Sequence, residues 1–160
     1  MTIINKGSML GNINDVVIRE IEYNSTDYSN ELKLRDEVLR KPLRMSLYDE
    51  NLAAEKNDIH IGAFINDDIV GVLILTRLKA NDVKMRQVAV KGIMQSKKIG
   101  SKMVHYAEEN AKNRGYKNIL LNARKTAVEF YKKLGYETIS EEFLEINIPH
   151  YKMSKYINCQ

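Results

Sequence analysis

Residues 83–103 read VKMRQVAVKGIMQSKKIGSKM and decide the predicted fold, because a strand pattern passes here into the start of a helix. In VKMRQVAV (83–90) the side chains alternate between two faces, as in a β-strand. From Ile99 to Arg114 apolar residues recur at helical spacing. A helix that connects two strands of one sheet makes them parallel neighbours, and NILLNAR (118–124) supplies the second strand. The stretch therefore predicts a strand–helix–strand unit.

Hairpin patterns lie on either side of this unit. Strands are expected at VVIREIEY (16–23), IHIGAFI (59–65) and IVGVLIL (69–75), with the turn sequence NDD joining the last two into a hairpin. YETIS, FLEINI and IPHYKMSKYI supply strands near the C-terminus. One helical crossover among hairpins predicts an α/β (α+β) fold with a mixed, mostly antiparallel sheet that is flanked by helices.

Helical patterns occupy the segments between these strands. TDYSNELKLRDEVLR (26–40) has its apolar residues close to helical spacing, and a shorter helix is expected within 46–56. A further helix is expected at TAVEFYKKL (126–134), where Thr126 and Glu129 have the spacing of a capping box.

The composition fits one domain over 15–160, preceded by a loose N-terminal arm at 1–14 that is rich in Asn, Gly and small polar residues. The apolar run at 69–75 is far shorter than the ~20 residues that a membrane-spanning helix needs. The single cysteine, Cys159, excludes an internal disulfide and fits a reducing compartment. We therefore expect a cytoplasmic protein with no membrane association.

Three lysines surround the expected start of the central helix, near Gly100. A helix start is already partly positive and favours acidic neighbours, yet Lys97, Lys98 and Lys102 lie there. An anion bound by the unpaired N–H groups explains this charge, although a solvated basic turn is the alternative. The net charge of +4 is compatible with an anionic ligand but too small to indicate nucleic acid. Neither a P-loop nor a GxGxxG fingerprint is present.

The order of these segments resembles the GNAT family of N-acetyltransferases over about residues 16–155. The pyrophosphate loop of that family, Q/R-x-x-G-x-G/A, is aligned here with residues 95–101. Gln95 and Gly100 match, Lys98 replaces the first glycine, and Ser101 replaces the final Gly/Ala. AVEFYKKLGYE at 127–137 is a strong match in its position after a strand. The segments LRDEVLRKPLR, MRQVAV and EFLEINIPHYKM are similar to the ElaA/YjcF-like branch of the family.

The resemblance implies a sheet whose central parallel strands splay apart, with acetyl-CoA as cosubstrate and no metal. The strand residues Val88, Ala89 and Val90 would bind the pantetheine, and the backbone N–H of Val88 would polarise the thioester carbonyl. The remaining implied contacts to coenzyme A are Gln95, Ser96, Lys97, Lys98, Ile99, Gly100, Ser101, Asn122, Arg124, Phe130 and Tyr131.

Proton transfer needs both an acid and a base. Tyr131 matches the helix tyrosine of the family and is the expected acid for the departing thiolate, with a core aromatic as the alternative. An acceptor amine must lose a proton before attack, but the strand VKMRQVAV lacks the glutamate that many family members use. The base candidates are Glu142, Glu145, His150 and His60, and deprotonation through water stays open.

The favoured function is acetyl transfer from acetyl-CoA to a primary amine of a small molecule. Direct attack in a ternary complex is expected, because Cys159 is badly placed to carry an acetyl group. The alternatives are a protein or peptide N-acetyltransferase and a non-catalytic regulatory module that binds coenzyme A. Nucleic acid is not an expected partner, since no RNA-binding aromatic motif is present. The family resemblance makes a homodimer plausible.

Overall fold

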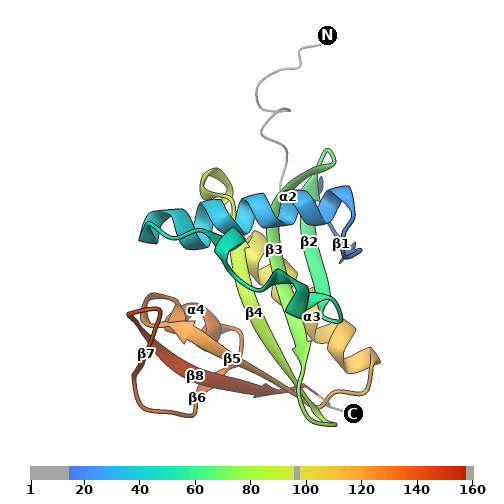
Figure 1. Ribbon diagram of the computed structural model, residues 1–160. Coiled ribbons are helices and arrows are strands. Elements are labelled where there is room, and N and C mark those ends of the chain that lie inside the picture. Colours follow the sequence, from blue (N-terminus) through green and yellow to red (C-terminus); the bar gives the residue numbers. More distant parts are fainter. Residues whose placement is uncertain (1–14, 96–97, 158–160) are drawn as a thin grey trace. The chain divides into compact units, whose positions relative to one another are not determined.

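The computed structural model describes residues 15–95 and 98–157 (Figure 1). Its helices and longer strands are β1 (Val17–Ile21), α2 (Thr26–Arg35), β2 (Ile59–Ile65), β3 (Asp68–Arg77), β4 (Asp82–Val90), α3 (Ile99–Asn113), β5 (Asn118–Arg124), α4 (Val128–Lys133) and β8 (Ile148–Tyr156). The short strands β6 (Glu137–Thr138) and β7 (Phe143–Glu145) lie between α4 and β8 in the chain. The expected arm at 1–14, together with Ser96, Lys97 and Cys159, lies outside the described residues.

The strands follow the order β1-β2-β3-β4-β5-β8-β6, and β7 pairs with β8. The pair β4–β5 is parallel, as expected from the helical connection between the two strands, which is α3. The pairs β1–β2, β5–β8, β6–β8 and β7–β8 are antiparallel. The expected mixed, mostly antiparallel sheet flanked by helices is therefore confirmed. No helix in the described part of the chain is long and apolar enough to cross a membrane.

The chain divides into two compact units. The first unit comprises Met1–Ile74 and Gln87–Tyr106, and the second comprises Leu75–Arg86 and Ala107–Gln160. The composition favoured one domain over 15–160, and that expectation stays a prediction.

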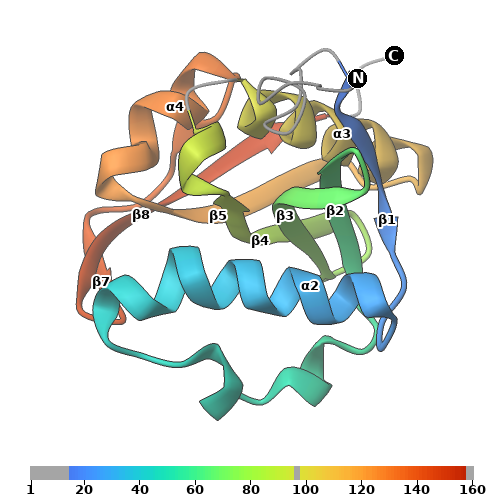
Figure 2. The same cartoon turned by 90° about the horizontal axis from the view of Figure 1, so that it is seen from above.

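In the first unit, helices cover both faces of the strands. Figure 2 shows α2 across one face of β2, β3 and β4, with the first turns of α3 on the opposite face. Leu34 of α2 packs against Val72 of β3 and Ala89 of β4. Gly71 has the opposite orientation because side chains alternate along a strand. A Cβ on Gly71 would lie 2.8 Å from the Met103 sulfur, so this glycine lets α3 approach β3 closely.

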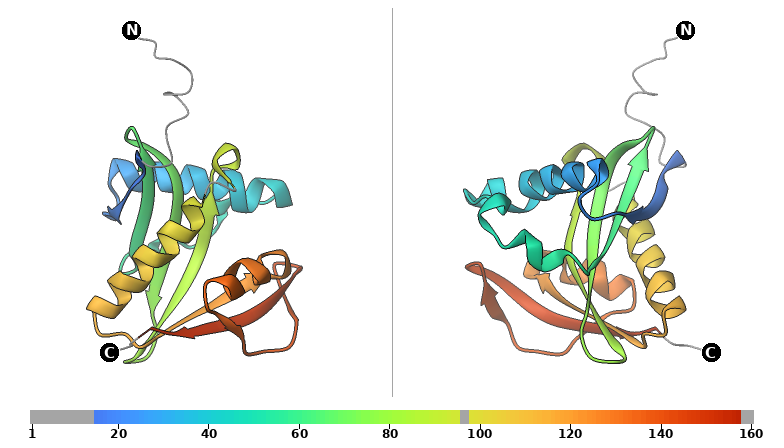
Figure 3. Two further views of the ribbon diagram at one scale, coloured as in Figure 1. Left: turned by 180° about the vertical axis from the view of Figure 1, so that it is seen from behind. Right: turned by 45° about the vertical axis from the view of Figure 1, so that its right-hand side comes forward.

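In the second unit, β5 and β8 form the longest ladder, which runs from Asn118↔Tyr156 to Arg124↔His150. Figure 3 shows α4 beside these strands. Gly115 and Gly135 have φ of 90° and 98°, conformations that glycine adopts without strain and that end α3 and α4.

Two hairpins have two-residue turns with positive φ. Asn66 and Asp67, at 51° and 69°, join β2 to β3 and confirm the NDD turn. Ile146 and Asn147, at 45° and 61°, join β7 to β8. The strand expected over FLEINI therefore ends at Glu145, because the chain reverses at the next two residues.

Three helix predictions need correction. The helix expected over 26–40 is α-helical only to Arg35 and continues as a π-helical turn over Asp36–Arg40. The segment 46–56 forms two 3₁₀ turns, Leu47–Asp49 and Leu52–Glu55. The capping box was wrong: a 3₁₀ turn at Lys125–Ala127 contains Thr126, and the cap position of α4 falls on Ala127 without a side-chain hydrogen bond.

The close approach at Gly71 gives a stability prediction. Gly71→Val places side-chain atoms where Met103 lies, and overpacking of this kind costs about 1–3 kcal/mol. Urea denaturation should show this decrease in the free energy of unfolding. Gly92→Ala is the control, because a Cβ at Gly92 meets nothing within 4 Å. Equal stability of Gly71→Val and wild type would contradict a tight α3–β3 contact.

Candidate active site

The start of α3 has the properties of an anion site. The helix begins at Ile99, and its first turn contains no acidic residue. The Lys102 N–H donates to the Lys98 carbonyl over 3.1 Å, which starts the helical hydrogen-bond ladder. The N–H groups of Ile99, Gly100 and Ser101 precede that bond and have no acceptor within an α-helix. The exposed side chains of Lys98 and Lys102 add positive charge at the same end.

Lys98 has the backbone conformation of a glycine. Its φ is 66°, in the left-handed region that costs an L-residue about 1–2 kcal/mol. This is the position at which the family pattern has its first glycine, a residue that adopts a positive φ without strain. On the other side of the loop, the Gln95 side-chain amide donates to the Val90 carbonyl over 3.0 Å and ties the loop to β4.

β4 changes its backbone path halfway along. Its parallel ladder with β5 runs from Asp82↔Asn118 to Met85↔Leu121. Two residues later Gln87 has φ of 56°, a positive value that marks a β-bulge inside a strand. Val88, Ala89 and Val90, the residues expected to bind pantetheine, follow this interruption. The sequence pattern alone did not indicate the bulge.

Tyr131 lies in an aromatic cluster on α4. Its side chain is buried, and its ring meets Phe130 at a centroid distance of 5.0 Å and Tyr136 at 5.7 Å, both edge to face. The Tyr136 hydroxyl donates to Glu108 over 2.9 Å. Burial raises the pKa of Tyr131 above its usual value of 10.0, because an ionised phenolate would lose its hydration. Tyr131 therefore keeps its proton at neutral pH, as a general acid must.

Asn122, Glu145 and His150 meet on β5, β7 and β8. The Asn122 amide donates to Glu145 Oε1 over 2.9 Å, and Glu145 Oε2 lies 3.7 Å from His150 Nε2. His150 Nδ1 lies 2.7 Å from the Ile148 carbonyl, and the Phe143 ring stacks on the imidazole at 6.0 Å. Three residues that the sequence singled out separately therefore form one cluster.

Glu142, the other carboxylate candidate, has different partners. The Tyr151 hydroxyl donates to its Oε1 over 3.2 Å, and Lys125 Nζ lies 3.2 Å from the same oxygen. Glu142 is thus part of an exposed ion pair, and the same carboxylate oxygen contacts both Lys125 and Tyr151.

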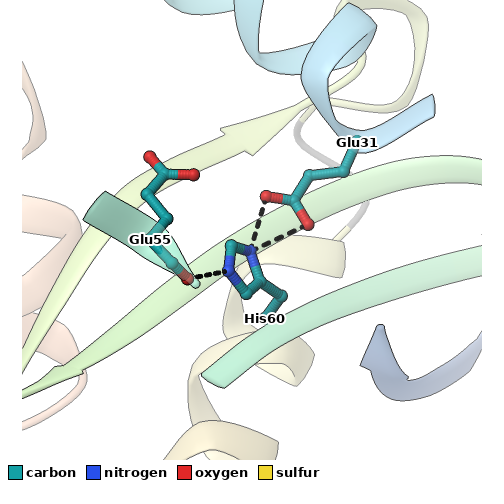
Figure 4. Close-up of side chains that lie close together, drawn as sticks. All are labelled: Glu31, Glu55 and His60. Carbon is teal, nitrogen blue, oxygen red and sulfur yellow. Dashed lines mark hydrogen bonds and ion pairs between the residues drawn. The ribbon is translucent and has the colours of Figure 1, made fainter. Parts of the chain in front are cut away.

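His60 belongs to a buried network instead of an open site. Figure 4 shows its ring between Glu31 of α2 and Glu55. Nε2 lies 3.0 Å from the Glu55 carbonyl oxygen, which can only accept, so Nε2 carries a hydrogen. Nδ1 lies 2.9 Å from Glu31 Oε2. Burial opposes the charged imidazolium, but the hydrogen bond and charge of Glu31 outweigh it and raise the pKa of His60. Both nitrogens donate, so neither is available as a base.

Arg35 neutralises the same network. Glu31, Glu55 and His60 offer metal-ligand types within 4.8 Å of one another, but the Arg35 guanidinium lies between the two carboxylates. It donates to Glu31 over 2.9 Å and to both oxygens of Glu55 over 2.8 and 2.6 Å. The Tyr28 hydroxyl also donates to Glu55 over 3.2 Å. Two carboxylates are thus balanced by Arg35 and His60, and the network fixes the segment that contains Glu55 onto α2.

A cavity of about 350 Å³ lies in the first unit, and none of the predicted site residues lines it. Its walls come from α2 and the π-helical turn after it, the β2–β3 turn, the start of β3 and the residue after β4: Asn30, Lys33, Leu34, Glu37, Asp67, Asp68, Ile69 and Lys91.

The network predicts how stability depends on pH. Because the folded-state pKa of His60 is raised, its contribution is fully present below the usual value of 6.5 and is lost as pH rises through the folded pKa. His60→Gln should lower the free energy of unfolding by about 3–5 kcal/mol at pH 6, as expected for a broken buried ion pair. Above pH 6.5 the difference from wild type should shrink by at most about 1.4 kcal/mol per pH unit.

Urea denaturation from pH 5.5 to 9 measures this difference, and His105→Gln, at an exposed position, is the control. If the difference in the free energy of unfolding between wild type and His60→Gln did not change with pH, His60 would not be charged in the folded protein.

Comparison with known proteins adds family information to this geometry. Residues 24–157 match the family model described as "Acetyltransferase (GNAT) domain". The Bacillus subtilis protein called uncharacterized N-acetyltransferase YjcF is 31% identical over 136 residues, which cover 84% of this chain and 96% of YjcF. Escherichia coli ElaA has the same fold, with a TM-score of 0.76 at 19% identity over 88% of this chain and 99% of ElaA. An aminoglycoside 6'-N-acetyltransferase complexed with coenzyme A has a TM-score of 0.75 at 19% identity over 90% of this chain and 98% of that protein.

Proposed function

The chain belongs to the GNAT family of N-acetyltransferases, in the branch of YjcF and ElaA, and we propose that it acetylates a primary amine of a small molecule. Acetyl-CoA supplies an activated thioester, and the amine attacks it directly in a ternary complex. The observation that carries the proposal is the start of α3, where the first N–H groups of the helix and the side chains of Lys98 and Lys102 meet without an acidic residue in the first turn. Such a helix start favours a diphosphate.

The residues around this helix start suit the diphosphate of coenzyme A. The backbone N–H groups from Ile99 to Ser101 point along the helix toward an anion and act with its dipole. Gly100 has no side chain to separate a ligand from the backbone. Lys98 and Lys102 add charge-assisted contacts, which are about twice as strong as neutral hydrogen bonds.

We assign the pantetheine to the strand segment Val88–Val90. An extended backbone offers N–H and C=O groups at the spacing that the amides of pantetheine require. The bulge at Gln87 re-aims the chain just before this segment. In the proposed reaction the Val88 N–H donates to the thioester oxygen, where negative charge develops during attack.

Tyr131 is the proposed acid for the thiolate that leaves. Its raised pKa keeps the hydroxyl protonated but makes it a weaker acid, so in the proposed step the proton moves as negative charge develops on the sulfur. The aromatic contacts with Phe130 and Tyr136 hold the ring in place.

Gly100→Glu tests the coenzyme A assignment. The added carboxylate repels the diphosphate and fills the space at the backbone, so the Kd for coenzyme A should rise at least about tenfold. Isothermal titration calorimetry measures it. Ser29→Glu adds the same charge at an exposed position of α2 and is the control. Unchanged affinity of Gly100→Glu would refute the assignment of the loop.

Tyr131→Phe tests the acid. The substitution removes only the hydroxyl, so kcat should fall by about 10²–10⁴ while the affinity for coenzyme A stays constant. Tyr156→Phe, at an exposed tyrosine, should leave kcat unchanged. Release of free thiol from acetyl-CoA in the presence of tyramine, spermidine, glucosamine or a lysine-containing peptide provides the assay. Full activity of Tyr131→Phe would show that Tyr131 has only a packing role. In the same assay, a preference for the peptide over the small amines would favour the protein N-acetyltransferase alternative.

A further inference from the structure

We propose that Glu145 and His150 bind the ammonium group of the acceptor and that His150 Nε2 takes its proton. The inference rests on the proposed acetyl transfer and assigns the base that β4 does not supply. The geometry selects this pair from the four candidates that the sequence offered, because Glu142 is paired with Lys125 and both nitrogens of His60 donate.

The tautomer of His150 follows from its backbone contact. The Ile148 carbonyl oxygen, 2.7 Å from Nδ1, accepts hydrogen bonds and cannot donate them. Nδ1 therefore carries the hydrogen. In the neutral imidazole the other nitrogen, Nε2, then has a lone pair and can accept a proton. His150 is 3% exposed, and stacking against Phe143 fixes the plane of its ring.

Glu145 is held opposite this lone pair. The Asn122 amide donates to Glu145 Oε1 over 2.9 Å, which leaves Oε2 directed toward His150. Glu145 Oε2 and His150 Nε2 lie 3.7 Å apart, beyond hydrogen-bond distance. Two acceptors that face each other at this separation match a donor with several hydrogens, since one nitrogen can lie about 2.8 Å from both. A primary ammonium group is such a donor.

Strand register explains why these groups share one face. Directly opposed residues of an antiparallel pair lie on the same side of a sheet. His150 is opposed by Arg124 on β5 and by Phe143 on β7. Asn122 and Glu145 are two residues from those partners and so share the face. By the same register, the other charged residues on this face are Arg124 of β5, Lys152 of β8, Glu137, which is opposed to Ser154, and Asp82 and Lys84 of β4, which pair with Asn118 and Leu120. Glu145 is half-exposed, so an amine can reach the cluster from solvent.

The proton balance of the reaction is complete with these groups. The acceptor enters as R–NH₃⁺ and gives one proton to His150 Nε2, which passes it to solvent. The amine nitrogen forms a bond to the acetyl carbon, and the carbon–sulfur bond breaks. The Tyr131 hydroxyl delivers a proton to the sulfur, and the second proton that leaves the nitrogen is relayed through water to restore the Tyr131 hydroxyl. The products are the amide R–NH–CO–CH₃ and the free thiol.

The first experiment needs no turnover. In the full chain with ¹⁵N-labelled histidine, NMR distinguishes a bare ring nitrogen from a protonated one, and His150→Asn assigns the signals. At pH 8 we expect hydrogen on Nδ1 only, and a shift of the Nε2 signal on titration with methylammonium chloride. Glu145→Gln should weaken that response at least tenfold in concentration. An imidazolium at pH 8, or hydrogen on Nε2, would overturn the proposal.

The second experiment measures kinetics with the amine that the thiol-release assay identifies. His150→Asn keeps a donor for the Ile148 carbonyl and removes Nε2. It should lower kcat/KM at least 100-fold and abolish the acid limb of the pH profile, with unchanged affinity for coenzyme A. Glu145→Gln should act mainly by raising the KM for the amine. Glu141→Gln, at an exposed neighbour on the same segment, should change neither parameter.

These outcomes separate the two proposals. Loss of coenzyme A binding in Gly100→Glu together with a fully active His150→Asn would keep the acetyltransferase and refute the base. A loss of activity in Glu142→Gln alone would move the base to Glu142. Absence of turnover with every amine would count against the proposed function, while the NMR titration would still decide whether Glu145 and His150 bind an ammonium group.

Discussion

The backbone of β4 is the constraint on which the fold and the proposed site both depend. Over Asp82–Met85 the strand satisfies its hydrogen bonds in a parallel ladder with β5. At Gln87 it adopts a positive φ, which costs about 1–3 kcal/mol and persists only where the surroundings enforce it. Ala89, beyond the bulge, is packed under α2 against Leu34. The bulge thus lies between the residues of β4 that pair with β5 and the residue that packs under α2, just before the segment assigned to pantetheine.

The buried charges of the first unit solve a different problem. The chain between α2 and β2 contains only short helical turns, and Leu47 is its fully buried apolar side chain, with Leu52 packed against the same core cluster. Arg35 and His60 attach it through Glu55, and Glu31 completes the charge balance. A buried ion pair is weak evidence of net stabilisation, but removal of one member leaves an unpaired charge. The network therefore specifies where this segment lies more than it adds to stability.

At the level of sequence, hydrophobic periodicity and turn residues predicted most of the strands and helices. NILLNAR matches β5, and NDD matches the β2–β3 turn, because both signals are local. The features that the sequence predicted wrongly or did not predict depend on tertiary structure. The spacing of Thr126 and Glu129 fits a cap, but the 3₁₀ turn shifts the helix start beyond it. Glu31 and Arg35 are spaced as an ordinary surface pair, and only the fold buries them. Likewise, Asn122 and Glu145 are 23 residues apart and meet only through strand register.

In the proposed reaction, burial determines the protonation of the acid, and a backbone hydrogen bond determines the tautomer of the base. Burial among aromatic rings raises the pKa of Tyr131, so its hydroxyl is fully protonated but is a weaker acid than an exposed tyrosine. A backbone carbonyl fixes the hydrogen of His150 on Nδ1, so the nitrogen that must accept a proton is bare. Neither the protonation of Tyr131 nor the tautomer of His150 depends on a carboxylate on β4. A chain without the strand glutamate can therefore catalyse the same reaction if the β7–β8 hairpin supplies the base. The two-residue turn at Ile146 and Asn147 brings Glu145 and His150 together.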